Sequence, residues 1–277
     1  MNTLAAAPYY ALAIFFVIVV SLELGRWLGK RQLAIDPEGA RTGIGAIEGA
    51  VFGLLALLIA FTFSGAASRL DARRDLIVQE TNAIGTAWLR LDLLPASEQP
   101  AIRQSFREYV DARLAYYRDL HDPVIAAQEN NRALSAQLHI WKQIMAAIAL
   151  LPNPAPGLSA AQAFNDVIDI TTNRRVALNT HPPMVIYLML LALTWVSALL
   201  IGFGMAGAAR RNWLHSLGYA LVMVSVLYVI LDFEYPRRGI IRVDQFDLIL
   251  EEQRDSMEER RAQGPVISDS SRLAWRL

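Results

Sequence analysis

One run of 20 residues without a charged side chain, between Glu48 and Arg69, constrains this chain more than any other feature. The run is rich in Leu, Ile, Phe and Ala, and its length is about what a helix needs to cross a hydrocarbon core of roughly 30 Å. Beyond Arg69 the sequence becomes amphipathic, and no Pro interrupts it before Leu94. We therefore predict one long helix, from Gly43 to Leu94, that crosses a membrane and continues into water.

Three further apolar stretches predict three more membrane-spanning helices. The first covers residues 8–28, where the apolar centre precedes the cations, which is the reverse of a secretory signal. The other two lie between Pro182 and Ala209 and between Asn212 and Leu231. The hydrophobic fraction of 54% and the mean hydropathy of +0.30 agree with a membrane protein.

The polar midsection is expected to be entirely helical, because no stretch alternates as a half-buried strand would. Its expected core has two parts. The first is a stripe along the long helix in which an apolar residue recurs every seven positions, with one Trp beside it, and the second is one side of the next helix. These residues are Leu70, Ile77, Ile84, Leu91, Trp88, Ile102, Phe106, Val110 and Tyr117.

A later helix of the midsection has apolar residues at the 4-3-4-3 spacing of a coiled-coil seam. These residues are Leu134, Leu138, Trp141, Met145 and Ile148. We expect three of the midsection helices to begin at polar residues that cap helix N-termini, namely Ser97, Asp122 and Ser159.

These features divide the chain into four expected parts. Residues 1–65 would hold transmembrane helices 1 and 2, and residues 66–182 a helical extramembrane domain continuous with helix 2. Residues 183–235 would hold transmembrane helices 3 and 4, and residues 236–277 an amphipathic helix and a polar, disordered end. The expected fold class is all-α, a multi-pass membrane protein with a helical domain inserted between spans 2 and 3.

Composition excludes several classes of function. The 26 basic and 26 acidic residues balance, so we expect no nucleic-acid partner. The chain has no Cys, and its four His are scattered, so we predict no metal site and no cofactor. Asp232 and Glu234 end the fourth span, where two acids favour placement at the membrane interface over Ca²⁺ binding. No motif of a known catalytic class occurs, and we predict no catalytic residue and no enzyme.

Gly45, Gly49 and Gly53 form a row of small residues at the start of the second span. Small residues let membrane helices approach closely, which is one interpretation of the row. The other continues it through Leu57 and Phe61, because each step of four residues advances only about 40° around a helix. Repeated around a symmetric oligomer, a face of Gly53, Leu57 and Phe61 would form an apolar constriction that gates a pore by dewetting.

Three cations, Arg69, Arg73 and Arg74, follow the same span. They anchor the helix at the interface and pair locally, or, in an oligomer, they form a cationic vestibule that concentrates anions. A little further along, the polar run from Glu80 to Asn82 lies beside the apolar stripe. It predicts helix contacts that are hydrogen-bonded across a protomer boundary.

Two segments resemble bestrophins. FTFSGAASRLDARR is similar to the second-helix signature of that family, with Phe61, Ser64, Arg69 and Arg74 at matching offsets. RLDARRDLIVQETNAIGTAWLRLDLLP and YPRRGIIRVDQ more closely resemble a bacterial group labelled bestrophin-like (DUF4239). The chain departs from the bestrophin pattern at Leu70 and Asp71, which replace a Trp pair, and at Gly53, which replaces a bulky residue of the neck.

The resemblance implies a homopentameric channel for anions such as chloride, with a pore lined by the second span and a hydrophobic neck at Gly53, Leu57 and Phe61. It also implies that the midsection is cytoplasmic. The count of Lys and Arg in the short loops implies the opposite orientation, with the midsection outside.

We therefore expect a multi-pass protein of the bacterial inner membrane whose partners are the lipid bilayer and further copies of the same chain. Two functions follow. The first is an oligomeric anion-permeable channel, and the alternative is a non-conducting scaffold or sensor whose helical domain binds a protein partner.

Overall fold

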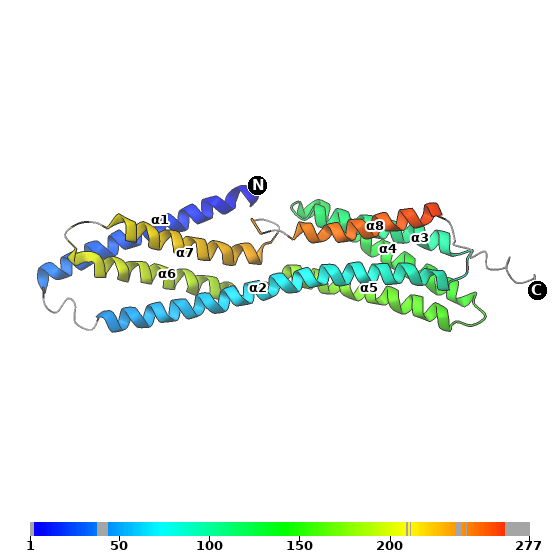
Figure 1. Cartoon of the computed structure of the whole chain (residues 1–277), viewed down its shortest axis with the longest axis horizontal. Helices are drawn as coiled ribbons and strands as arrows, with labels where there is room; N and C mark the ends of the chain where they lie inside the picture. The colour runs from blue at the N-terminus through cyan, green and yellow to red at the C-terminus, as the bar shows by residue number, and fades with distance from the viewer. Residues whose placement is uncertain are drawn as a thin grey trace, which may run out of the picture. The chain divides into compact units, whose positions relative to one another are not determined.

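The computed structural model describes residues 3–37, 44–208, 210, 212–236, 240–241 and 243–263. Within these residues there are helices and turns and no strand, which confirms the predicted all-α fold. The elements, in chain order, are α1 (Thr3–Ile35), α2 (Ile44–Arg90), η2 (Leu91–Leu93), α3 (Gln99–Arg118), α4 (Pro123–Ala149), α5 (Ala155–Asn179), α6 (Met184–Gly204), η3 (Met205–Gly207), α7 (Trp213–Glu234) and α8 (Asp244–Gln263) (Figure 1). The polar end predicted to be disordered after Leu250 is wrong in its first part, because α8 continues as a helix to Gln263; residues 264–277 lie outside the described residues.

Four helical stretches are long and apolar enough to cross a membrane, as predicted. They are Tyr9–Ile35, Gly45–Leu93, Ala155–Gly207 and Trp213–Glu234. The second of them confirms the long helix, because α2 continues without a break from Ile44 to Arg90 and passes into the 3-10 turn η2. Leu94 then turns to an extended backbone, as expected of a residue that precedes a Pro.

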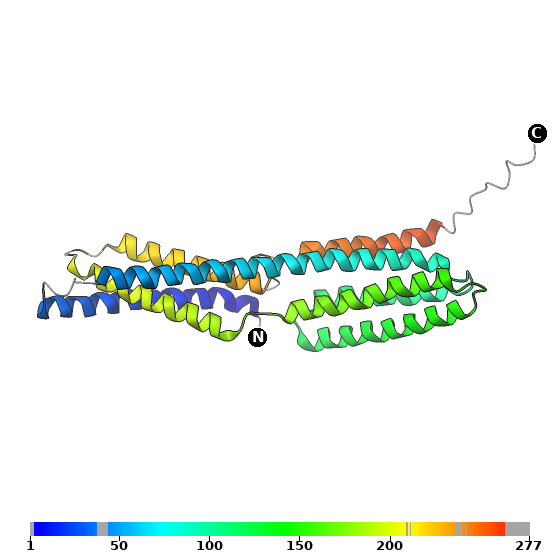
Figure 2. The ribbon, with the colours of Figure 1, turned by 90° about the horizontal axis from the view of Figure 1, so that it is seen from below.

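The chain forms two compact units, and α2 contributes to both. Unit 1 consists of residues 1–72 and 179–242, and therefore holds α1, the first part of α2, α6, η3 and α7. Unit 2 consists of residues 73–178 and 243–277, and holds the rest of α2 with α3, α4, α5 and α8 (Figure 2). The predicted division at residues 65, 182 and 235 stays a prediction.

The core of unit 1 is apolar, and its closest helix contact is between α1 and α6. A Cβ added to Gly25 would overlap the carbonyl oxygen of Leu199, and one added to Gly202 would overlap that of Leu22. The two backbones therefore approach where only Gly fits, as is common between membrane helices. The fully buried apolar residues of this core are Ile18, Leu22, Leu55, Ala66, Leu190, Ala198, Ala220, Met223, Leu227 and Ile230.

The core of unit 2 confirms the two apolar faces predicted for the midsection. All nine residues of those faces are buried, and the seven from Ile84 onward belong to the core cluster of unit 2. Trp88 meets Phe106 edge-on, with ring centroids 6.0 Å apart, and Phe106 meets Phe164 of α5 at 5.6 Å. The α8 helix adds Leu250 and Met257 to the same core.

Of the three predicted helix starts, only Asp122 is confirmed. Its carboxylate accepts hydrogen bonds from the backbone N–H groups of Val124 and Ile125, at 2.9 and 3.3 Å, ahead of Pro123 at the first helical position. The prediction that Ser97 caps α3 is wrong. Glu98 occupies the N-cap, and the hydroxyl of Ser97 donates to the Glu98 carboxylate. The prediction that Ser159 begins the next helix is also wrong, because α5 begins earlier, at Ala155.

The coiled-coil seam predicted from Leu134 to Ile148 lies on α4, and we call it the α4 seam; most of it lies outside the core of unit 2. Leu134, Leu138 and Met145 are exposed, and only Ile148 at its end is buried. The helix packs instead through the adjacent face, which carries Ala133, Gln137, Ile140, Ile144 and Ala147. The seam is therefore an apolar stripe available to something outside the unit.

Candidate functional site

The first part of α2 packs in unit 1 through one side only. Leu55 and Ala66 are buried there, with Leu58 and Ile59 partly buried beside them. At about 100° per residue, the face made of Gly53, Leu57 and Phe61 lies roughly opposite that side. Leu57 is 53% exposed and Phe61 is 68% exposed, so the predicted pore-lining face is uncovered in a single chain.

The second span is also the least covered of the four. In its most apolar window only 6% of the residues are buried, against 22–28% in the other three spans. A Cβ added to Gly45, Gly49 or Gly53 would meet no atom within 4 Å. The Gly row is therefore not used for helix packing within one chain, and that role belongs to Gly25 and Gly202.

The first predicted vestibule cation, Arg69, is paired within unit 1. Its Nε donates to Oε1 of Glu234 over 2.8 Å, and a terminal guanidinium nitrogen contacts the same oxygen. The buried Glu234 carboxylate also lies 3.5 Å from Nδ1 of His181, whose ring stacks on Tyr235 at a centroid distance of 4.7 Å. One carboxylate at the end of α7 thus holds the cation that follows the apolar run of α2.

The other two predicted vestibule cations belong to unit 2. Arg73 is buried, and its Nε donates to the carbonyl oxygen of Ala177 at the end of α5, 3.1 Å away. Arg74 is half-buried. Of the three cations, Arg73 is therefore the least accessible to a solvated anion in a single chain.

The acids at the end of the fourth span are bound by donors of the chain itself. The Asp232 carboxylate accepts from the backbone N–H groups of Ile240 and Ile241, at 3.0 and 2.8 Å, and so closes the turn that follows α7. Glu234 is held by Arg69. Within the described ranges, no group of three or more His, Asp or Glu could hold a metal ion.

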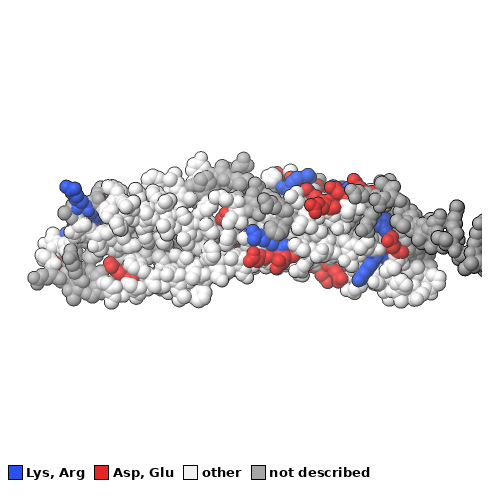
Figure 3. All heavy atoms as spheres, viewed as in Figure 1, with Lys and Arg blue, Asp and Glu red and all other residues white. Residues whose placement is uncertain are grey.

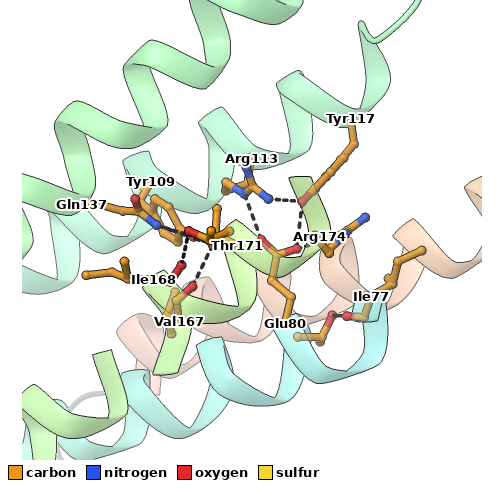
Figure 4. Close-up of polar contacts among 12 residues, drawn as sticks. Ile77, Glu80, Tyr109, Arg113, Tyr117, Gln137, Val167, Ile168, Thr171 and Arg174 are labelled. Atoms are coloured by element: carbon orange, nitrogen blue, oxygen red, sulfur yellow. Dashed lines mark hydrogen bonds and ion pairs between the residues drawn. The ribbon is translucent and has the colours of Figure 1, made fainter. Parts of the chain in front are cut away.

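Unit 2 contains a buried ionic network, which we name the Glu80 network (Figure 4). Nε of Arg113 donates to Oε1 of Glu80 over 2.8 Å, and Arg174 contacts Oε2. The Tyr117 hydroxyl donates to Oε2 over 3.0 Å, and the Arg174 guanidinium lies 3.6 Å above the Tyr117 ring. Arg174 also reaches Asp247 of α8 at 3.2 Å, so the network joins α2, α3, α5 and α8.

This network corrects the expectation for Glu80, which is bonded inside one chain and not across a protomer boundary. Burial alone would raise the pKa of Glu80, but the two guanidinium groups outweigh it and hold the pKa below its usual value. The carboxyl is therefore ionised in the core. The sequence carried a signal for this pairing, because Glu80 and Arg113 each fall on the apolar face of their helix, at spacings of three and four from its core residues.

A second set of polar groups lies next to the network (Figure 4). The Thr171 hydroxyl donates to the carbonyl oxygen of Val167 over 2.7 Å, so the Tyr109 hydroxyl, 2.9 Å away, donates to Thr171. The amide of Gln137 approaches both oxygens, at 3.4 and 3.5 Å. Burial raises the pKa of Tyr109, which keeps it a neutral donor. These contacts join α3, α4 and α5.

Residues 14–246 match the sequence model of the Bestrophin-like domain. The chain belongs to the Bestrophin-like family. The resemblance inferred from the second span and from the segment after the fourth is thereby confirmed, and the apolar spans together with the family establish an integral membrane protein. Among curated proteins, none matches the chain.

Two solved structures share the fold of this Bestrophin-like chain. A membrane protein carrying a single Pro-to-Ala substitution is 14% identical, with a TM-score of 0.65 over 89% of this chain and 98% of its own. A bacterial bestrophin homologue from Klebsiella pneumoniae, carrying a Tyr-to-Ala substitution, is 17% identical, with a TM-score of 0.62 over 89% of this chain and 99% of its own. At these identities the likeness shows the fold, and it extends over both units of the Bestrophin-like chain.

Proposed function

We propose that this Bestrophin-like protein is an oligomeric, anion-permeable channel of the bacterial inner membrane, a pentamer that passes anions such as chloride. The second span lines its pore through Gly53, Leu57 and Phe61, and Arg69, Arg73 and Arg74 supply the anion vestibule that follows the span. The proposal assigns no catalytic residue.

The observation that carries the proposal is the uncovered face of α2. A span that packs on its own chain through one side must bury its other side against lipid or against further copies. Small residues, Gly49 and Gly53, lie toward that other side, which suits the close approach of copies around an axis better than contact with acyl chains.

The same face predicts where the pore is narrowest. Gly53 carries no side chain, Leu57 a medium one and Phe61 the bulkiest. A ring of Phe61 side chains is therefore the tightest apolar constriction, and such a ring gates by excluding water. Permeation should depend more strongly on Phe61 than on either of the other two positions.

Removing this ring is the direct test. We expect Phe61→Ala to raise the single-channel conductance severalfold, or to leave the channel open, because the apolar barrier to water and ions is lost. The measurement is the current through purified full-length protein in a planar bilayer, with the reversal potential under a chloride gradient reporting anion selectivity.

The matched control for this test is Phe16→Ala, because Phe16 is also an exposed aromatic residue of a membrane span, 59% exposed on α1. It should leave the current unchanged. Equal effects of the two substitutions, or the absence of current for any anion in the unaltered protein, would contradict the proposal.

The α4 seam supports a second candidate function, a non-conducting scaffold or sensor whose helical domain binds a protein partner. Leu134, Leu138 and Met145 leave an apolar stripe on unit 2, whose surface otherwise carries many charged side chains on the face shown in Figure 3. Such stripes mark contact surfaces for other helices.

Under this alternative, Leu138→Glu should abolish recovery of a bound partner, because a carboxylate would be desolvated in the contact, while membrane insertion stays normal. The measurement is affinity purification of the full chain from membranes, followed by quantification of the associated protein. Ser135→Glu adds the same charge to a neighbouring exposed position of α4 and should leave the partner bound. A current that survives Leu138→Glu, with no partner recovered from the unaltered protein, would exclude the scaffold.

A further inference from the structure

The end of unit 1 where α1 and α6 finish and α7 begins gathers basic and aromatic side chains. Here Gly29 allows α1 to pack against Phe203 and Ala206. A terminal nitrogen of Arg26 then donates to the carbonyl oxygen of Ala208, 3.1 Å away, just after η3. These contacts place the last turns of α1 beside the short connection that leads to α7.

Four cations of this region are described, and their surroundings differ. Arg26 is buried, and its Nε has no hydrogen-bond partner among the described residues. Lys30, Arg31 and Arg210 are exposed. No described carboxylate forms an ion pair with Lys30 or Arg210.

The acids nearest to these cations along the spans do not offset them at the surface. Glu23, one turn earlier on α1, and Glu48, near the start of α2, are both half-buried. A Cβ added to Gly204 would lie 3.4 Å from Oε1 of Glu48, which has no exposed area and no hydrogen-bond partner among the described residues. Asp36, directly after the end of α1, is exposed at this end, where the four described cations outnumber it.

Two exposed Trp side chains accompany the cations. The guanidinium of Arg31 lies 4.1 Å from the ring centroid of Trp27, a cation–π contact that restrains both side chains. Trp213 is the first residue of α7 and is also exposed. Trp side chains at the ends of membrane spans lie at the depth of the lipid headgroups, which is where the phosphate groups are.

At the opposite ends of the same helices, the described residues show a different combination. There the cation Arg69 is neutralised by Glu234, and the exposed aromatic residues are Tyr9, Tyr10 and Tyr235. Among the described residues of unit 1, exposed cations without a carboxylate partner and exposed Trp side chains therefore coincide at one end. That asymmetry points to a negatively charged component of one leaflet.

We propose that this end of unit 1 binds the headgroup of an anionic phospholipid. Lys30 and Arg210 hold the phosphate oxygens as the solvent-facing donors, the stacked Trp27–Arg31 pair covers the headgroup and its glycerol backbone, and Trp213 packs on the first methylenes of the acyl chains. The buried Arg26 adds a fixed positive charge beneath the site. This binding site is independent of whether the protein conducts ions.

The test compares lipids that share their chains and differ in charge. Purified full-length protein in detergent is titrated with phosphatidylglycerol or with phosphatidylcholine of the same chain length, and the bound lipid is counted by native mass spectrometry. We expect phosphatidylglycerol to bind and phosphatidylcholine not to compete. Each cation removed should weaken binding about fivefold, which corresponds to the contribution of about 1 kcal/mol that one Lys or Arg makes near an anionic surface.

The double variant Lys30→Gln and Arg210→Gln should therefore bind phosphatidylglycerol about 25-fold more weakly. Its matched control is Lys142→Gln with Arg118→Gln, which removes two exposed cations from unit 2 and should change nothing. Both altered positions are solvent-facing, so the fold is retained, and Trp27→Leu provides a second variant that weakens binding without a change of charge.

Two outcomes would overturn the inference. Equal binding of the two lipids would show that the headgroup charge is not recognised. An equal loss in the control variant would show that the attraction is not local to this end. Displacement of phosphatidylglycerol by inorganic phosphate at the same concentration would show a site for a free anion instead of a lipid headgroup.

Discussion

Glu80→Gln should lower the free energy of unfolding of unit 2 by about 3–5 kcal/mol, the usual cost of removing one partner from a buried ion pair. Glu80 is fully buried and is contacted by two guanidinium groups, Arg113 and Arg174, which are themselves 1% and 3% exposed. Gln occupies the same volume but is neutral. Two positive charges would then remain in the core, with the Asp247 carboxylate near one of them, Arg174.

Hydrogen exchange of the full-length protein in detergent, resolved by mass spectrometry, measures this loss at the helices concerned. Amides of α3 and α5 should exchange far faster in the variant, because both helices are joined to α2 through Glu80. The control is Glu108→Gln on α3, whose exposed carboxylate is bonded only to Gln104 within its own helix. Surface changes of this kind stay within about 0.5 kcal/mol. Similar effects of the two substitutions would contradict a structural role for the network.

The same residue predicts how the stability of unit 2 depends on pH. The pKa of Glu80 is lower in the folded chain than its ordinary value of 4.5, so the unfolded chain binds the proton more tightly. The stabilisation is therefore complete above pH 4.5 and is lost as the pH falls through the lowered pKa. The Gln variant has no carboxyl at this position, and its stability should fall less steeply with acid than that of the unaltered protein.

The elements that could be predicted from the sequence are those that a local pattern determines. The length of α2 follows from an uncharged run joined to an amphipathic one, and the core of unit 2 follows from the spacing of its apolar residues. The start of α4 follows from Asp122 and Pro123, which act within one turn. The structure confirms all of these, because each depends on residues that are close in sequence.

Features that depend on distant partners could not be predicted in this way. The predicted Gly row on α2 has no neighbour in one chain, whereas Gly25 and Gly202, 177 positions apart, make the tightest helix contact. The partners of Glu80 lie 33 and 94 positions away. The exact start of a helix could not be predicted either: Glu98 and not Ser97 occupies the N-cap of α3, and α5 already begins at Ala155, four residues before Ser159.

Adding a single methyl group at two Gly positions should separate packing from permeation, with the larger effect on folding at Gly25. Gly25→Ala places a Cβ inside the carbonyl group of Leu199, where the obstacle is backbone and cannot rotate away. We expect at least the upper part of the cost of overpacking, about 1–3 kcal/mol, and a loss of the α1–α6 contact.

Gly53→Ala adds the same methyl group where no atom lies within 4 Å. Ala is the better helix former by roughly 0.5–1 kcal/mol, so this variant should be as stable as the unaltered protein or slightly more stable. Thermal unfolding of both variants in the same detergent, with hydrogen exchange in α1 and α6, checks the contrast. If Gly25→Ala were tolerated as well as Gly53→Ala, the close contact of α1 and α6 would be refuted.

Because Gly53 tolerates added volume in one chain, larger side chains at this position probe the oligomer alone. If copies of α2 surround a pore, Gly53→Leu adds a second apolar ring beyond Leu57 and should reduce the current strongly while the fold is kept. If the face of Gly53 meets lipid instead, the same Leu is favourable and the current does not change. Stability thus responds to Gly25 and current to Gly53. A Gly53→Leu variant that keeps its stability and loses its current would locate the pore on α2.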